Sequence, residues 1–442
     1  MEPQGAGIAI YDYVILGCGV SALTAARRLC EQGRTVLIIE HYEAPGGNHQ
    51  SHIIDGLEFD IGSIYFNSSD EQFRYFPELL QECRATTVLV KKISTTGAVG
   101  NYPFDWQIDG VGNARELVSA VFSLLIARLR FGRYEDADHY ARSRIGDVLY
   151  RRVGLDLYIK RLFGAGATQI DVDFALKRMQ WLARETSLRY RLRRLFGRAR
   201  AKKRPVARTM VRQPGGFARY YACAVRALEE RGVTFRFEDT ILALETGGAV
   251  CRLQTTSGSY IGTKLISTIP LSEMSRLCHL PDPDLPAVTL LSLFVTLRGT
   301  WRPACSVLYN FHTQGNWKRI TLHSDFYQAP RQGSCHFTVE VTVPPGAIAP
   351  TAEEAFAGVQ AHLLALKIVD GELALIGSTQ LANAYPVPEK GFKARRDAVV
   401  RSFAEKGILC IGRQGKFEYI PHSNIAAKEA VAILERTVFL QH

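Results

Sequence analysis

The chain has 442 residues, of which 47% are hydrophobic and 22% are charged. This length predicts at least two domains, and the composition excludes an intrinsically disordered chain. The net charge of +11 is uneven, because the segment from Thr186 to Leu228 is rich in Arg and Lys and contains no Asp or Glu.

A strand, a glycine-rich loop and a helix open the sequence. Residues 12–16 (DYVIL) are short, apolar and partly β-branched, which is typical of a buried parallel strand. A GxGxxA loop follows at residues 17–22, and the next apolar run predicts a helix that ends near Gly33. A second strand is predicted at residues 35–39, directly before Glu40.

The loop has the properties of a dinucleotide-binding turn. Gly17 permits the tight turn from strand to helix, and Gly19 lets the backbone approach a pyrophosphate. Ala22 allows the helix to pack closely on the strand, and the helix N-terminus offers free N–H groups to phosphate oxygens. Glu40 lies at the end of the second strand, where a carboxylate accepts hydrogen bonds from ribose hydroxyls.

The residues after Glu40 indicate which dinucleotide binds. Residues 41–48 (HYEAPGGN) contain Gly46 and Gly47, followed by Asn48. This pattern looks like the E-x(5)-GG extension of flavoproteins, in which the glycines let the backbone pass under FAD, and its GGN form is similar to that of the UDP-galactopyranose mutases. The resemblance implies FAD rather than NAD.

Later segments resemble elements of the same FAD-dependent superfamily, which includes amine oxidases, protoporphyrinogen oxidase and UDP-galactopyranose mutase. They are residues 59–67 (FDIGSIYFN), 102–104 (YPF), 158–164 (YIKRLFG), 214–217 (PGGF), 319–321 (RIT), 384–388 (AYPVP) and 408–419 (ILCIGRQGKFEY). The resemblance implies an α/β fold, with a Rossmann-like (two-dinucleotide-binding-fold) domain and a discontinuous α+β substrate domain.

We expect the FAD-binding domain to comprise residues 8–62, 212–285 and 403–442, and the substrate domain to comprise residues 63–211 and 286–402. Alternating runs at 234–237, 240–244 and 250–255 predict a three-stranded meander, and residues 290–297 and 335–343 predict strands of an antiparallel sheet. The longest apolar run, residues 117–127, is shorter than the about 20 residues of a membrane span, so we predict a core helix.

The resemblance also implies site residues. Those expected to bind FAD are Gly17, Gly19, Val20, Ser21, Ala22, Glu40, His41, Gly46, Gly47, Asn48, Ile241, Gly412, Arg413 and Asn424. Those expected to line a substrate pocket are Arg319, Tyr385 and Tyr419, with Arg413 beside them. Structural ion pairing of the arginines and core packing of the tyrosines are the alternatives. No metal-binding motif is present, and no metal site is expected.

Three positions depart from the mutase pattern. The two histidines expected in the segment beside the flavin are replaced by Ile64 and Asn67, and an acid expected near the C-terminus is replaced by Pro421. These departures favour an FAD-dependent oxidoreductase, which transfers a hydride from a small molecule to flavin N5. A mutase-like reaction on a nucleotide sugar and a flavin-binding scaffold without catalysis are the alternatives.

The basic segment allows two interpretations. The first is a solvated helical face or loop. The second is a segment that closes as a lid over an acidic or phosphorylated substrate, or that docks on an anionic membrane through Arg189 to Arg208. No nucleic-acid-reading module appears, so nucleic acid is not an expected partner. The odd number of cysteines, without a CxxC pair, predicts a reducing cytoplasm, with peripheral membrane contact as an alternative.

Overall fold

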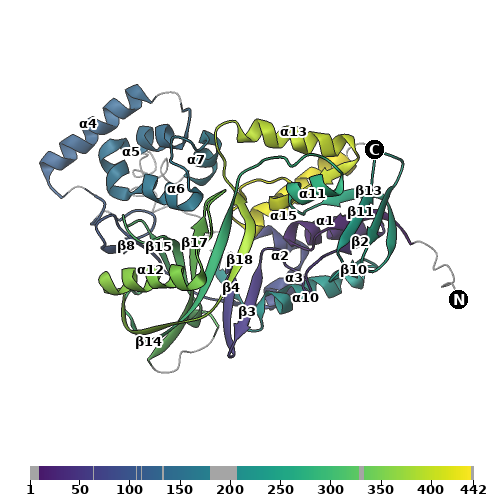
Figure 1. Ribbon diagram of the computed structural model, residues 1–442, viewed down its shortest axis with the longest axis horizontal. Helices are drawn as coiled ribbons and strands as arrows, with labels where there is room; N and C mark the ends of the chain where they lie inside the picture. Colours follow the sequence, from purple (N-terminus) through teal and green to yellow (C-terminus); the bar gives the residue numbers. More distant parts are fainter. Residues whose placement is uncertain are drawn as a thin grey trace, which may run out of the picture.

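The computed structural model describes residues 9–62, 64–105, 107–110, 112–131, 134–179, 207–327 and 333–439. The basic segment predicted as a lid or membrane-docking element spans residues 189–208, and its residues 189–206 lie outside the described residues. Figure 1 shows two large sheets side by side, one carrying the N-terminal strands and the other the long strands β14 and β18, with a group of helices beyond the second sheet.

The first sheet has the strand order β10-β2-β1-β13-β12-β11, and β19 also pairs with β13. Its parallel strands are β1 (Ile10–Leu16), β2 (Val36–Ile39), β10 (Thr234–Arg236), β13 (Ser259–Ser267) and β19 (Ile408–Cys410). α1 (Val20–Cys30), α10 (Gly216–Glu229) and α15 (Ser423–Leu434) share one hydrophobic cluster with β1 and β2. α11 (Leu271–Leu277) and α13 (Phe392–Glu405) pack in a cluster with alternate residues of the same strands. Both faces of the central strands are thus covered, which explains their continuous apolar runs.

The predicted meander is wrong in one strand. β11 (Ile241–Glu245) and β12 (Cys251–Thr255) form it with β13, in antiparallel pairs. β10 instead pairs in parallel with β2 at the opposite edge, with Phe235 beside Ile38. The helix α10 packs against α1 and returns the chain to that edge, so β10 follows a crossover connection and not a hairpin.

The second sheet has the order β18-β14-β17-β16-β15-β7-β8. Its strands are β7 (Val90–Ile93), β8 (Val99–Asn101), β14 (Ala287–Trp301), β15 (Val307–Asn310), β16 (Trp317–Leu322), β17 (Ser334–Val343) and β18 (Val369–Pro386). All neighbours are antiparallel except β15 and β7. α12 (Ala352–Ala365) covers one face, with Val359 and Leu363 buried against it. The strands predicted at 290–297 and 335–343 lie within β14 and β17.

The helical group consists of α4 (Ala114–Arg130), α5 (Ala137–Val153), α6 (Leu155–Phe163) and α7 (Val172–Arg178). Residues 117–127 form a helix as predicted, within α4, but the prediction that this helix lies in the core is wrong. Only Ala120 and Ala127 of α4 are buried. Phe122 is 64% exposed, and Leu129 is 87% exposed. Apolar composition alone cannot show which face of a helix a neighbour covers.

The remaining described elements are short and lie between the strands and helices already given or near the C-terminus. They are β3 (Gln50–Ile54), β4 (Leu57–Ile61), β5 (Tyr65–Asn67), α2 (Glu71–Tyr75), α3 (Pro77–Gln81), β6 (Cys83–Ala85), β9 (Thr209–Arg212), η2 (His323–Asp325), α14 (Gly412–Gly415) and η3 (Glu435–Phe439). β3 and β4 form a hairpin, whereas β9 lies between β5 and β6. Both large sheets draw their strands from the segments expected for their domains, while the exact domain boundaries stay a prediction.

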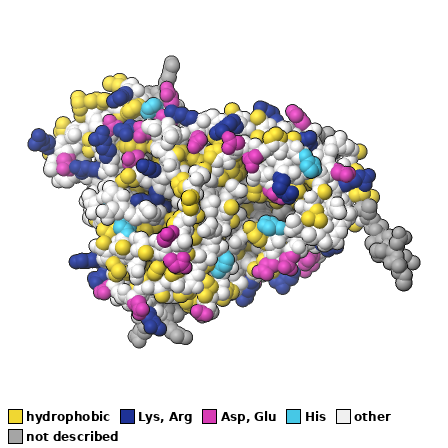
Figure 2. All heavy atoms as spheres, in the orientation of Figure 1, with side chains coloured by type: hydrophobic (Ala, Val, Ile, Leu, Met, Phe, Trp, Pro, Cys, Tyr) yellow, Lys and Arg dark blue, Asp and Glu magenta, His cyan; other side chains and the backbone are white. Residues whose placement is uncertain are grey.

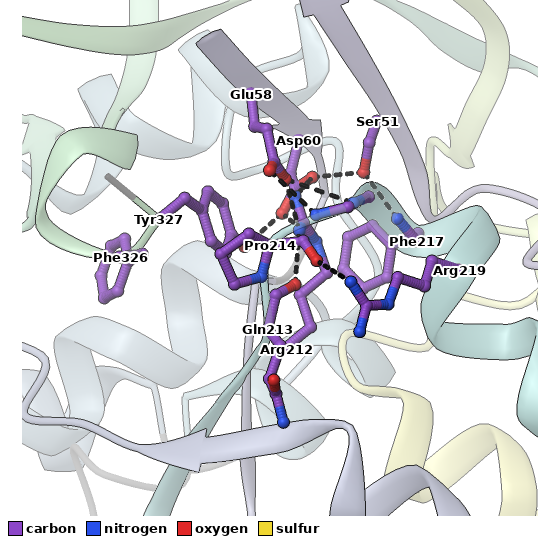
Figure 3. A network of polar contacts seen from close by, with 12 residues as sticks. Ser51, Glu58, Asp60, Arg212, Gln213, Pro214, Phe217, Arg219, Phe326 and Tyr327 are labelled. Atoms are coloured by element: carbon purple, nitrogen blue, oxygen red, sulfur yellow. Dashed lines mark hydrogen bonds and ion pairs between the residues drawn. The ribbon is translucent and has the colours of Figure 1, made fainter. Parts of the chain in front are cut away.

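A buried ionic network ties some of these short elements together (Figure 3). Arg212 at the end of β9 is fully buried, and its guanidinium pairs with Glu58 at 2.6 Å and with Asp60 at 2.6 Å on β4. Tyr327 donates its hydroxyl to Asp60, and its ring lies 3.9 Å from the Arg212 guanidinium carbon. Glu58 also accepts from the Gly215 amide at 2.9 Å, just before α10. The network thus joins four segments that are distant in sequence.

Candidate active site

The ends of β1, β2 and β13 border a cleft of about 200 Å³, which we call the dinucleotide cleft. Ligands of open α/β sheets bind at such carboxyl ends of strands. Most of the residues predicted to bind FAD line it: Gly17, Gly19, Val20, Ser21, Glu40, His41, Gly46, Gly47, Asn48, Gly412 and Arg413.

Close backbone approaches explain the glycines of this cleft. A Cβ at Gly47 would lie 3.2 Å from the Gly19 Cα, so the two loops touch where neither has a side chain. Gly17 has a φ of +92°, and a Cβ there would lie 2.5 Å from the Thr268 hydroxyl oxygen. Gly412 has a φ of +75°, and a Cβ there would meet the Ser21 side chain at 2.7 Å. Side chains at these positions would fill the cleft or strain the backbone.

Glu40 is buried, with 3% of its surface exposed. Its carboxylate accepts from the Cys18 amide at 2.7 Å and from the Tyr42 amide at 3.1 Å, and it lies 3.0 Å from His41 Nδ1. Its hydrogen bond raises the pKa of His41, while burial and the Glu40 charge raise the pKa of the Cys18 thiol. Glu40 is therefore an anchored acceptor, and Cys18 is an uncharged part of the loop.

The cleft fits a dinucleotide on three observations. The N-cap of α1 is Gly19, no side chain caps this helix, and Gly19, Val20 and Ser21 at its start line the cleft. Asn48 Nδ2 is a buried donor without a hydrogen-bond partner among the described residues. The C-terminal helix α15 begins at Ser423, which also lines the cleft. The backbone at the start of α1 and the Asn48 side chain thus offer hydrogen-bond donors for the oxygen atoms of a bound dinucleotide.

The other predicted cofactor residues lie apart from the cleft surface. Ala22 is fully buried in α1, where its small side chain belongs to the core beneath the loop. Ile241 is at the start of β11 and does not line the cleft. Asn424 accepts from the Glu71 amide at 2.8 Å and so holds α15 against α2. Contact of Ile241 and Asn424 with FAD stays a prediction.

A second cavity of about 220 Å³ lies against the first, and we call it the tyrosine cavity. Its six tyrosines come from three strands, one helix and two loops spread over most of the sequence. They are Tyr65, Tyr102, Tyr158, Tyr309, Tyr385 and Tyr419. The structure therefore brings the predicted Tyr385 and Tyr419 together. Tyr102 of the YPF segment and Tyr158 of α6 lie in the same cavity, although their segments are far apart in the sequence.

Cations outnumber anions around the tyrosine cavity. Arg178, Lys318, Arg319 and Arg413 line it, and Glu340 is its carboxylate. Neighbouring strand residues normally point to opposite faces, yet Lys318 and Arg319 both pair with Glu340. A register shift between Trp317 and Arg319 explains this, because a β-bulge redirects one side chain. The sequence analysis did not identify four residues of this cavity: Arg178, Tyr309, Lys318 and Glu340. For Lys318 the reason is the alternation of strand residues, which would have placed it on the face opposite Arg319.

The predicted pocket arginines are partly engaged within the protein. Arg319 pairs with Glu340 and donates to the Gly62 carbonyl at 2.8 Å, while its buried Nε has no hydrogen-bond partner among the described residues. Arg413 Nε donates to the Ile420 carbonyl at 2.9 Å. Structural pairing and ligand binding are therefore not exclusive here, because each guanidinium has five N–H groups.

The two cavities share a wall. Asn48, Gly62, Leu381, Arg413, Pro421 and His422 line both. Burial, together with the charges of Arg178, Arg413 and Arg319, lowers the pKa of His422 to about 4. His422 is therefore neutral near pH 7. A ligand in one cavity and a ligand in the other would both lie against these shared residues.

The three departures from the mutase pattern have different surroundings. Ile64 is buried against Val211, Phe326 and Tyr327 and lines neither cavity. Asn67 is exposed at the end of β5. Pro421 lines both cavities, next to His422. Among the described residues, no group of three His, Cys, Asp or Glu side chains has the geometry to hold a metal ion.

Comparison with known proteins supports this class of fold. The profile of an NAD(P)-binding Rossmann-like domain matches residues 15–83. Prolycopene isomerase from Daucus carota is 40% identical over 62 residues, which are 14% of this chain and 10% of that protein. The chain thus matches only about a tenth of the length of these curated relatives.

Solved structures match nearly the whole chain. A reduced UDP-galactopyranose mutase superposes with a TM-score of 0.77 at 17% identity, over 97% of this chain and 96% of the mutase. A protoporphyrinogen oxidase of Exiguobacterium gives 0.72 at 17% identity, over 99% and 100%. Cyclohexylamine oxidase from Brevibacterium oxydans gives 0.61 at 15% identity, over 98% and 100%. The predicted α/β fold with a Rossmann-like domain is confirmed, and at these identities the likeness to the solved structures is one of fold.

Proposed function

We propose that the chain is an FAD-dependent enzyme that binds FAD in the dinucleotide cleft and a small anionic substrate in the tyrosine cavity. The observation that supports this most directly is the shared wall of the two cavities. A substrate held by Arg319, Tyr385 and Tyr419 would lie next to the group bound beyond Arg413 and His422. Solved structures with the same fold include oxidases, isomerases and a mutase, so the fold supports an enzyme without selecting the reaction.

The charge of the tyrosine cavity supports an acidic or phosphorylated substrate. Lys318 and Arg319 share the single carboxylate of Glu340, so these two cations are only partly compensated. Arg178 and Arg413 add further positive charge to the lining of the cavity. Guanidinium groups bind phosphate and carboxylate oxygens in pairs. Each tyrosine supplies a flat apolar ring and one hydroxyl group, a combination that suits a sugar or another ring.

Oxidation of the substrate by hydride transfer is the reaction that we favour. FAD supplies a hydride acceptor at its N5 atom. The chain would bind and orient the substrate, and its closely packed aromatic rings would exclude water. Although burial opposes ionisation, Arg319 and Lys318 lower the pKa of Glu340. Glu340 is therefore an ionised partner of cations, and neutral His422 is a weak base, so neither is suited to proton transfer near pH 7.

A mutase-like reaction on a nucleotide sugar is the second candidate. In its favour, Arg319, Arg413, Tyr385 and Tyr419 line one cavity, as the resemblance to the mutases implied. Against it, Ile64 packs in an apolar cluster, and Pro421 offers no carboxylate. The choice between the two reactions depends on whether FAD must already be reduced for turnover.

Mass spectrometry of the small molecules released on denaturation tests the cofactor. We expect FAD from the purified protein, and NAD alone or no dinucleotide from a folded sample would contradict the proposal. Anaerobic mixing of the holoprotein with candidate phosphorylated compounds then tests the reaction. Bleaching of the flavin absorbance by a compound supports oxidation, whereas turnover of UDP-galactopyranose only after reduction with dithionite supports the mutase. A flavin spectrum that no ligand changes would indicate a scaffold.

A further inference from the structure

Helix α4 buries its small residues and exposes its large apolar ones, which is the reverse of the usual pattern in a globular protein. Its small residues Ala120 and Ala127 are the buried ones, and Ser123 Oγ accepts from the Val148 amide of α5 at 3.2 Å. The close approach is permitted by Gly146, where a Cβ would lie 2.8 Å from the Leu124 amide nitrogen. The large apolar residues lie on the opposite side: Leu117, Val118, Val121, Phe122, Leu125, Ile126 and Leu129 are all exposed.

This exposed stripe is continuous. Its residues recur every three or four positions, so they lie on one face of the helix. In Figure 1, α4 is the outermost helix of its group. In Figure 2, hydrophobic side chains gather with Lys and Arg over the same end of the molecule. Large exposed apolar patches of this kind mark contact with another molecule or a membrane.

The charges beside the stripe are cationic. Arg115 near the start of α4 and Arg128 and Arg130 at its end are exposed, and none has an ion-pair partner among the described residues. The acid of this helix, Glu116, already pairs with Arg152 at 3.1 Å. An apolar face bordered by free arginines is complementary to a surface that is apolar below and anionic above.

A second copy of the chain fits the same face less well. An antiparallel pair of α4 helices would bring Arg115 of one copy toward Arg128 and Arg130 of the other. A parallel pair would place each arginine beside its own counterpart. Either arrangement places like charges together, and Glu116 does not offset them because it already pairs with Arg152.

None of the described helices is long and apolar enough to cross a membrane.

We propose that α4 docks the protein on the surface of an anionic lipid bilayer, with its Leu117–Leu129 stripe in the headgroup–acyl boundary and its arginines among the lipid headgroups. The helix lies in the plane of the surface. Apolar burial supplies most of the binding free energy, and the arginines select anionic lipids. This inference does not depend on the proposed reaction.

Co-sedimentation of the full chain with vesicles tests the proposal. One set contains phosphatidylcholine alone, and the other contains phosphatidylcholine mixed with an equal part of phosphatidylglycerol. We expect binding to the mixed vesicles that weakens as NaCl is added and that is stronger than binding to the neutral set. Two glutamates in place of Phe122 and Leu125 should weaken binding by about a hundredfold or more, because two apolar side chains leave the membrane.

Matched variants separate this surface from other contributions. Ile348→Glu changes a side chain that is 97% exposed elsewhere on the chain, and it should leave vesicle binding unchanged. Arg128→Glu with Arg130→Glu should remove the preference for the anionic vesicles. The segment at residues 180–206 is identical in all variants, so binding that survives Phe122→Glu/Leu125→Glu would overturn the assignment to α4. Absence of vesicle binding by the wild-type chain would also overturn the proposal. If the wild-type chain is a dimer that Phe122→Glu/Leu125→Glu dissociates, the face is a contact between copies instead.

Discussion

At the scale of single residues, the tyrosine cavity is lined by cations that are only partly paired within the protein. Arg319 pairs with Glu340 and keeps a buried Nε without a partner among the described residues. The sequence resemblance identified Arg319 as a pocket residue, and the structure adds Lys318 and Glu340, which set its charge.

We predict that Arg319→Met weakens the binding of UDP, a diphosphate probe, by about 10- to 100-fold, because a charge-assisted hydrogen bond contributes roughly 1.5–3 kcal/mol. Titration of the flavin absorbance of the holoprotein measures the affinity. Arg302→Met is the control, since Arg302 pairs with Asp370 at the surface. Equal UDP affinity in the Arg319 and Arg302 variants would contradict anion binding in this cavity, and the FAD content should be unchanged in both.

The pKa of His422 predicts a pH dependence of stability. Burial and nearby arginines lower this pKa from 6.5 to about 4, so between these values the unfolded chain binds a proton that the native state does not. The contribution is complete above pH 6.5 and is lost as the pH falls toward 4. Its full size is less than the roughly 3 kcal/mol that 1.36 kcal/mol for each pKa unit would give, because the His422 side chain is exposed toward the cavities and solvent screens its charge.

Urea unfolding at about pH 7 and about pH 5 measures this effect. His422→Gln should make the free energy of unfolding fall less between the two values than it does in the wild type. Exposed His279→Gln is the control and should keep the wild-type difference. Burial and Arg413 also lower the pKa of His49 to about 4, so a residual decline is expected in the His422 variant.

At the scale of elements, two loops determine the dinucleotide cleft. The loop after β1 and the loop after β2 touch at Gly19 and Gly47, and a Cβ on Gly47 would be crowded against Gly19. Glycine at both positions was predictable, since the GxGxxA motif and the paired glycines each indicate a backbone that passes close to a ligand. The β-bulge in β16 was not predictable, because nothing in residues 317–322 marks a register shift that arises from pairing with β17.

We predict that Gly47→Ala abolishes or strongly reduces FAD binding. Gly47 has a φ of +60° and lies against Gly19, so alanine adds both backbone strain and a contact at 3.2 Å. Gly56→Ala is the matched control: its φ is +75°, but an added Cβ meets nothing within 4 Å. The control should lose about 1 kcal/mol of stability and keep its flavin. Flavin absorbance per protein is the measurement, and an undiminished value for Gly47→Ala would contradict FAD binding in this cleft.

At the scale of the whole molecule, the Arg212 network holds together segments that the sequence separates. Glu58 and Asp60 lie on the β3–β4 hairpin, Arg212 follows the helical group, and Tyr327 follows the strand β16 of the second sheet. Because Gly62 directly follows β4 and lines both cavities, the network also supports the shared wall of the site.

Arg212→Met should lower the free energy of unfolding by about 3–5 kcal/mol, because it leaves buried carboxylates without their partner. Arg219→Met, at a side chain that is largely exposed, should change it by less than about 0.5 kcal/mol. Chemical denaturation of both variants measures the difference. If a second set of changes, Glu58→Gln with Asp60→Asn, restores part of the loss in the Arg212 variant, the cost comes from unpaired charge. Equal stability of the Arg212 and Arg219 variants would contradict this account.

The sequence by itself determined the dinucleotide cleft and the class of fold. The strand, the GxGxxA loop, Glu40 and the paired glycines lie within one short segment, and local backbone geometry requires those residue types. Only the tertiary structure decided the charge of the tyrosine cavity, the edge position of β10 and the exposed face of α4. These features depend on which segments meet across long sequence separations and which faces their neighbours cover, and a helical or strand period describes a face without saying what lies against it.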